Sequence, residues 1–175
     1  MPNIEPFQIS VPDSALADLK ARLKNTRFPD EVPDTGWEYG TNLAYLKELV
    51  EYWRDQYDWR AHERQINRLA HFKANVDGNG IHFIHEKGKG PSPKPILLIH
   101  GWPGSILEFE KLIGPLTHPK DQNSPAFDVI IPSLPGFGYS GPTTTRGWGP
   151  LLMARALVSC SDGSFGLFQV RHPGW

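Results

Sequence analysis

The sequence predicts an α/β fold, and three observations carry this prediction. Two short apolar runs, residues 96–99 and 127–131, are each followed at once by a loop rich in glycine and proline. Such runs are typical of strands that are buried on both faces of a parallel sheet. Between and after the runs, apolar residues recur at helical spacing. Strands that alternate with helices in this order indicate a sheet covered by helices.

Length and composition limit the class of protein. The 175 residues allow one domain, or one domain and part of a second. The net charge of −1 gives no reason to expect nucleic acid or an anionic membrane as a partner. The single cysteine, Cys160, excludes an intrachain disulfide and fits a reducing compartment. No apolar run approaches the ~20 residues of a membrane span, and residues 1–5 lack signal-peptide features. The sequence therefore predicts a cytoplasmic protein.

The first residues predict a short strand and one helix. Residues 7–11 alternate between apolar and polar side chains, as in a strand. Helical spacing begins after Pro12, and Pro29 and Pro33 end it, so residues 27–40 form a loop. The apolar positions of this helix are Leu16, Leu19 and Leu23.

Two further helices are predicted before the sheet. Asn42 is a suitable N-cap for the first of them. The second covers residues 59–70, with Ile66 and Leu69 facing inward. Aromatic residues are frequent here, and we interpret them as packing between helices rather than as a cofactor site. They are Tyr45, Tyr52, Trp53, Tyr57 and Trp59.

A β-hairpin is predicted to begin the sheet. Residues 72–76 and 81–85 alternate, and Asp-Gly and Asn-Gly pairs join them. His82 and His85 alternate with apolar residues on the second strand, and we expect both to be hydrogen-bonded strand residues rather than metal ligands. His62, His71 and His118 have no partner at ligand spacing, so neither a metal nor a cofactor is expected.

One helix is predicted after each apolar run. Ser105 caps the first of these helices, and residues 149–158 form the second. The predicted buried positions of the first are Leu107, Phe109, Leu112, Ile113 and Leu116.

The loop after the first apolar run is the main candidate site. It reads His100-Gly101-Trp102-Pro103-Gly104. Two glycines and a proline within five residues force a sharp turn and let main-chain N–H groups approach a ligand. In α/β folds, ligands bind outside the carboxyl ends of the strands.

This loop resembles the HGxP signature of α/β-hydrolases, and of epoxide hydrolases in particular. The resemblance covers roughly residues 6–158 and includes the N-terminal domain of microsomal-type epoxide hydrolases. The segments that carry it are residues 6–26, 37–40, 45–49, 52–54, 58–60 and 132–140.

The resemblance implies a fold and a reaction. The fold is an incomplete α/β-hydrolase core (residues 71–158) after a helical, wrapping N-terminal segment (1–70), with a divergent tail (159–175). The reaction is hydrolysis of a small-molecule epoxide to a vicinal diol through a covalent aspartyl ester. It implies no metal and no cofactor. Trp102 corresponds to the residue whose N–H is one oxyanion-hole donor, and His100, Gly101 and Pro103 support the loop. His100 as a general base is the less expected alternative.

The sequence departs from the family pattern after the last predicted helix. Residues 165–170 are compatible with the strand that the family has there, but residues 171–173 contain no acid where the nucleophile turn is expected. Asp162 has small neighbours but follows a helix, so we do not expect it to be the nucleophile, and His172 is expected to be a surface residue. The lid tyrosines and the histidine–acid pair are not found either. We therefore expect a truncated product that is inactive alone, with an exposed sheet edge that favours self-association. The alternatives are a non-catalytic remnant or interaction module, and another HGxP hydrolase such as a haloalkane dehalogenase.

Overall fold

A computed structural model of the chain describes residues 4–76, 78–121 and 123–161. The described residues form two compact units. One unit is Ile9–Ile66, and the other contains the remaining described residues. None of the helices in the described part of the chain combines the length and apolar character that a bilayer-spanning helix needs.

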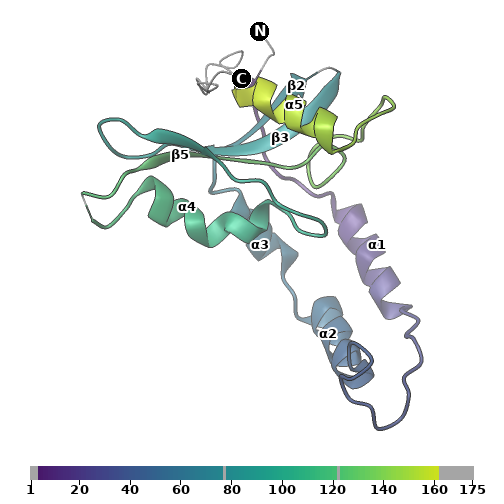
Figure 1. Cartoon of the computed structure of the whole chain (residues 1–175). Coiled ribbons are helices and arrows are strands. Elements are labelled where there is room, and N and C mark those ends of the chain that lie inside the picture. Colours follow the sequence, from purple (N-terminus) through teal and green to yellow (C-terminus); the bar gives the residue numbers. More distant parts are fainter. Residues whose placement is uncertain (1–3, 77, 122, 162–175) are drawn as a thin grey trace. The chain divides into compact units, whose positions relative to one another are not determined.

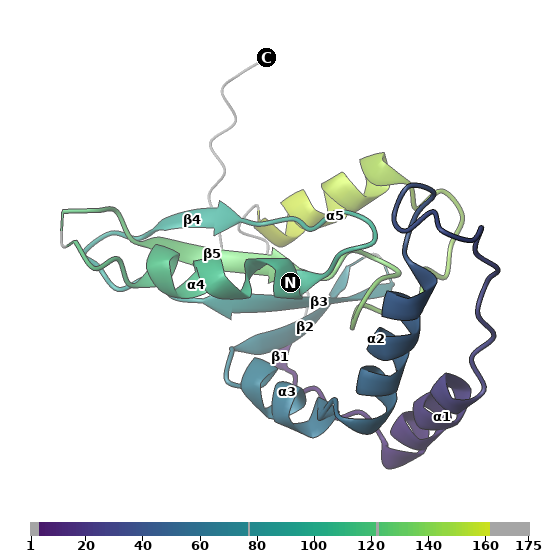
Figure 2. The ribbon, with the colours of Figure 1, turned by 90° about the horizontal axis from the view of Figure 1, so that it is seen from below.

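A mixed five-stranded sheet is the centre of the larger unit. The strands lie in the order β1-β2-β3-β5-β4 (Figure 2). β4 and β5 pair in parallel, and every other pairing is antiparallel. The strands are β1 (Ile4–Pro6), β2 (His71–Val76), β3 (Asn79–Glu86), β4 (Lys94–Leu97) and β5 (Phe127–Pro132).

The predicted hairpin is confirmed as β2 and β3. Val76 pairs with Asn79, which is the last pair of the ladder before the chain reverses. Gly78 has a φ of 80°, a conformation that glycine adopts at little cost. By contrast, the strand predicted over residues 7–11 is wrong. The pairing ends when Phe7 N–H donates to the carbonyl oxygen of His71, the first residue of β2.

Helices cover both faces of this sheet. α4 (Glu110–Thr117), preceded by the 3₁₀ helix η1 (Ile106–Phe109), lies on one face. α5 (Pro150–Ser161) lies on the other (Figure 1). The predicted last helix is confirmed, and so is the Ser105 cap, whose Oγ accepts from Leu107 N–H.

The buried face predicted for the helix after Ser105 is partly wrong. Leu107 and Leu112 are 45% and 48% exposed, whereas Ile106 and Ile113 are buried. Residues 106–109 form a 3₁₀ turn, which has three residues per turn instead of 3.6. The change in period rotates the apolar positions away from those that α-helical spacing predicts.

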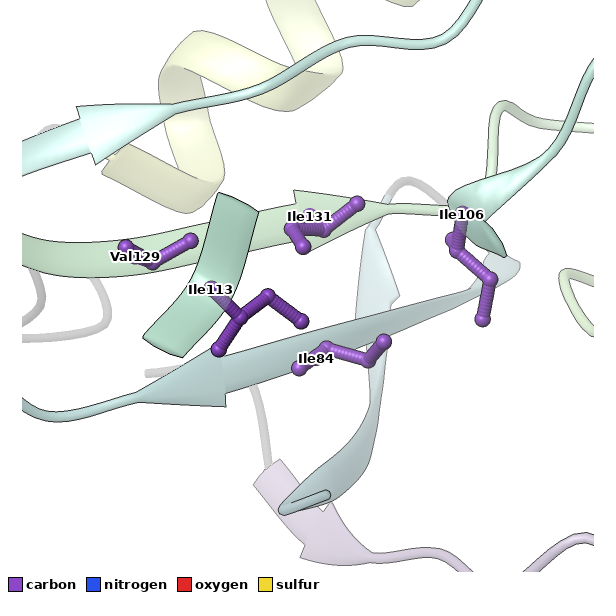
Figure 3. Packing of buried hydrophobic residues seen from close by; sticks show 5 residues of the cluster. All are labelled: Ile84, Ile106, Ile113, Val129 and Ile131. Carbon is purple, nitrogen blue, oxygen red and sulfur yellow. The ribbon is translucent and has the colours of Figure 1, made fainter. Parts of the chain in front are cut away.

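The core lies on both faces of β3 and β5. On the α4 face, Ile113 points onto Ile84 and lies between Val129 and Ile131, with Ile106 beside them (Figure 3). The opposite face has a smaller cluster, which consists of Ala74, Phe83 and Ile130.

The first apolar run is less buried than the sequence predicts. Among the described residues, β4 is the last strand in the sheet order. Its residues Ile96 and Leu97 pack against the two clusters but stay partly exposed, and Ile99 beyond it is 50% exposed. A strand with a neighbour on only one side cannot be covered as fully as an interior strand.

The smaller unit is helical. Its helices are α1 (Asp13–Lys24), α2 (Leu43–Asp55) and α3 (Trp59–Ile66). The predicted cap of α2 is confirmed, since Asn42 Oδ1 accepts from Tyr45 N–H at 3.0 Å. α3 ends four residues earlier than predicted, because the chain must turn before β2 begins at His71.

Candidate functional site

Two loops follow the parallel strands β4 and β5 at the same edge of the sheet. They are residues 98–104 and 133–141. Leu98 N–H donates to the Ile130 carbonyl oxygen at 2.9 Å and extends the pairing past β4. Gly104 N–H then donates to the Gly101 carbonyl oxygen at 2.8 Å, which closes a tight turn. The first loop is therefore held at both ends.

His100 joins the two loops from a buried position. Leu134 N–H donates to its Nε2 at 3.1 Å, and its Nδ1 lies 3.1 Å from the Gly101 carbonyl oxygen. Because an amide N–H can only donate, Nε2 carries no proton, so Nδ1–H donates to Gly101. The ring of Phe137 lies edge-on to His100. His100 thus uses both nitrogens on main-chain groups of the loops.

Trp102 is at the exposed tip of the first loop. Trp102 is 82% exposed, and its peptide bond to Pro103 is cis. Its N–H has no hydrogen-bond partner within residues 4–76, 78–121 and 123–161. An N–H in this position is available to an oxyanion.

Glu108 adds a carboxylate beside the same loop. A Cβ built on Gly104 would lie 1.2 Å from Glu108 Oε1, so this side chain lies directly against the glycine. Sequence analysis did not single out Glu108, because the position of its side chain depends on the 3₁₀ turn.

Known protein families match almost all of the described chain. The family described as "Epoxide hydrolase N terminus" matches residues 4–109, which is more than half of the sequence. The chain belongs to the epoxide hydrolase family. The family described as "alpha/beta hydrolase fold" matches residues 94–167. The predicted α/β-hydrolase fold class is therefore confirmed.

Individual relatives agree with this membership. A protein of Stigmatella aurantiaca, named as a candidate epoxide hydrolase, is 50% identical over 156 residues, which are 87% of this chain and 36% of that protein. Epoxide hydrolase 1 of Sus scrofa is 38% identical over 160 residues, with 87% and 35% covered.

A solved structure of the family superposes on the chain. The juvenile hormone epoxide hydrolase of the silkworm Bombyx mori has a TM-score of 0.86 and 32% identity. The match covers 95% of this chain and 44% of the silkworm protein. This chain therefore spans well under half the length of the epoxide hydrolases that it resembles.

A buried polar cluster behind the loops was not predicted as a unit. His82 Nε2 lies 2.9 Å from His71 Nδ1, and His82 Nδ1 lies 2.8 Å from Ser133 Oγ. The hairpin register could have indicated the histidine pair, since His71 and His82 are diagonal neighbours on one face. Nothing local indicates Ser133, which is 51 residues from His82 in the sequence.

The two strand histidines differ in their environment. Burial, with smaller effects from His71 and Lys73, lowers the pKa of His82 to about 3. Burial also lowers the pKa of His85, whose Nε2 is buried without a hydrogen-bond partner in the described part of the chain. The prediction of a hydrogen-bonded strand histidine is confirmed for His82 and wrong for Nε2 of His85.

The other candidate residues form no second site. Among the described residues, no three or more histidine, cysteine, aspartate or glutamate side chains could hold a metal ion. Asp162 and His172 lie outside the described residues. Their predicted lack of a catalytic role therefore stays a prediction.

The helical unit contains an apolar hollow of about 650 Å³. Four of the predicted aromatic packing residues line it, namely Tyr52, Trp53, Tyr57 and Trp59. The only ring contact among these four is between Tyr52 and Tyr57, at 6.4 Å. The packing interpretation is thus only partly right, because these rings border open space as well as each other. The hollow lies within Ile9–Ile66, whereas the two loops belong to the other unit.

Proposed function

We propose that residues 100–104 form one side of the oxyanion hole of an epoxide hydrolase. The observation that carries the proposal is the Trp102 N–H, which has no partner among the described residues and is held on a loop fixed by His100. Family membership supplies the reaction, and the site supplies the donor. His100, Gly101 and Pro103 act as supports of this loop.

In the proposed reaction, a carboxylate attacks one ring carbon of the epoxide. The C–O bond of that carbon breaks, the ring oxygen takes a proton from a tyrosine, and a covalent ester forms. Water activated by a histidine–acid pair then attacks the ester carbonyl. The Trp102 N–H stabilises the oxyanion of the resulting tetrahedral intermediate, which collapses to the diol and the free carboxylate.

We further propose that the 175-residue chain does not hydrolyse epoxides alone. The ring nitrogens of His100 contact main-chain groups and not a carboxylate, so His100 lacks the partner of a water-activating base. The substrate class, small-molecule epoxides, follows from the family, and a cytoplasmic location stays a prediction.

The oxyanion role is tested in a hybrid enzyme. Residues 4–158 of this chain replace the matching segment of the Bombyx mori enzyme, and epoxide hydrolysis is measured. Trp102→Pro removes the N–H, and we expect kcat to fall about 10²–10³-fold. Trp102→Ala keeps the N–H and should retain activity close to that of the parent hybrid. Equal activity of the two variants would contradict the proposal.

A second proposal concerns self-association at the β4 edge. Lys94 N–H donates to the carbonyl oxygen of Ala126, just before β5, and Leu98 N–H donates to that of Ile130 in β5. Alternation along the strand therefore turns the N–H groups of Leu97 and Ile99 toward the other edge, which has no partner strand among the described residues. Ile99 adds an apolar side chain there that is 50% exposed. An open edge with apolar side chains favours pairing with another chain. This feature is also the one that supports an interaction module as the alternative function.

A further inference from the structure

A buried row of side chains leads from the hairpin to the loop after β5. It consists of His71, His82 and Ser133, which are 4%, 0% and 1% exposed. The nitrogen–nitrogen and nitrogen–oxygen distances of 2.9 and 2.8 Å are those of hydrogen bonds. Buried polar groups whose bonds are all made hold their neighbours in one arrangement, because breaking a bond leaves a costly unpaired group.

The same histidine also fixes the far end of the loop. His82 N–H donates to Ser140 Oγ at 2.9 Å, and the Ser140 hydroxyl donates to the Ser133 carbonyl oxygen at 2.7 Å. Ser133 N–H in turn donates to the His82 carbonyl oxygen. One strand residue therefore holds both Ser133, at the start of the loop, and Ser140, next to its last residue.

Leu134, which follows Ser133 in this loop, connects the loop through His100 to the proposed oxyanion donor, the Trp102 N–H. Leu134 N–H donates to His100 Nε2, and His100 Nδ1–H donates to the Gly101 carbonyl oxygen, whose peptide unit contains the Trp102 nitrogen. We infer that the His82–Ser133 pair is a positioning unit, which sets the direction of the Trp102 N–H through Leu134 and His100. The catalytic value of this positioning rests on the proposed oxyanion role. The structural coupling between Ser133 and the Trp102 N–H does not depend on that role.

The surroundings of His82 keep its ring neutral. Phe7 and Tyr139 contact the ring edge-on, and Lys73 Nζ lies 4.2 Å from the centre of the Phe7 ring. Burial, His71 and Lys73 all lower the pKa of His82. A neutral ring has one donor and one acceptor nitrogen, so it can bond to both His71 and Ser133 without carrying a charge.

The arrangement also resembles a nucleophile with a base and an orienting group, but burial excludes that role. Ser133 is 1% exposed, and a Cβ on Gly138 would lie 2.9 Å from its Oγ. No substrate atom can reach the hydroxyl without opening the loop. Ser133 and His82 are therefore positioning residues.

The first test is an NMR measurement of histidine ring tautomers on the ¹⁵N-labelled 175-residue chain. We expect His100 as the Nδ1–H tautomer, with an unprotonated Nε2 that accepts from Leu134, and His82 in a single neutral tautomer at neutral pH. A His100 ring protonated at Nε2, or a protonated His82, would overturn the inference. This measurement needs no variant and no substrate.

The second test compares two buried hydroxyls. Ser133→Ala removes the bond to His82. We expect it to shift the amide resonances of Leu134 and Trp102 and the ring resonances of His100. Thr117→Val removes the hydroxyl that donates to the Ile113 carbonyl oxygen from a residue that is 2% exposed. It should leave those resonances in place.

Unchanged Trp102 and His100 signals in Ser133→Ala, or equal shifts in both variants, would overturn the coupling. If Ser133→Ala does not fold, the inference is judged by the His100 and His82 tautomers of the parent chain. Both NMR tests are made without substrate. A hybrid enzyme in which Trp102→Pro keeps full activity would therefore contradict the oxyanion role without affecting the coupling.

Discussion

At the scale of single residues, His82 is a group whose burial has a measurable consequence. Its pKa lies at about 3 in the folded chain, compared with 6.5 for an unperturbed histidine. Between these values the unfolded chain binds a proton that the folded chain does not bind. The free energy of unfolding therefore falls as the pH falls below 6.5, by up to about 1.4 kcal/mol per pH unit for this one group.

His82→Gln tests this pH dependence. Glutamine can hydrogen-bond in the same place but does not titrate, so we expect a weaker loss of stability between about pH 6.5 and about pH 5. The free energy of opening is measured from hydrogen exchange of the β3 amides. His118→Gln, which removes a histidine from an exposed site instead, is the matched control. An unchanged slope in His82→Gln would contradict the burial argument.

Sequence reasoning reached these residues only in part. Alternation in the hairpin was enough to place His82 on a strand and to predict that it is hydrogen-bonded. Its partner Ser133 comes from a distant loop, and local spacing contains no information about such a contact. Similarly, the HGxP resemblance singled out His100, but its bond to Leu134 depends on the packing of two loops.

At the scale of elements, turn and cap signals were the most informative. Gly78 marked the hairpin turn, and Asn42 and Ser105 marked helix starts, because each residue type solves a local backbone problem. The errors arose where packing against other parts of the chain determines the local structure. The 3₁₀ turn at residues 106–109 changed which leucines are buried. The end of β1 is set by the residue at which its partner strand, β2, begins.

The open edge of β4 gives a prediction at this scale. Ile99→Lys places a charge on the exposed edge, and we expect the Kd of self-association to rise at least about tenfold, or about 1.4 kcal/mol. Leu112→Lys is the control, because Leu112 is similarly exposed but lies on α4. Sedimentation equilibrium gives both constants. If Leu112→Lys dissociates the chain and Ile99→Lys does not, the interface lies elsewhere.

At the scale of the whole molecule, the chain combines two compact units that match one family. The match with an epoxide hydrolase of more than twice the length covers 95% of this chain and so includes residues of both units. The fold class could be predicted because a sheet covered by helices needs apolar strands and tight loops after them, and both features are visible in the sequence. The three-part division at residues 70 and 158 stays a prediction.

The most direct test is hydrolysis of an aryl epoxide by the purified 175-residue chain, beside the Bombyx mori enzyme in the same buffer. We expect the silkworm enzyme to form diol and this chain to form none above the uncatalysed rate, because we propose that the chain contributes an oxyanion donor but neither the nucleophile nor the water-activating base. Diol formation by the chain that is abolished by Asp162→Ala or by Glu108→Gln would contradict this expectation, and it would identify the nucleophile.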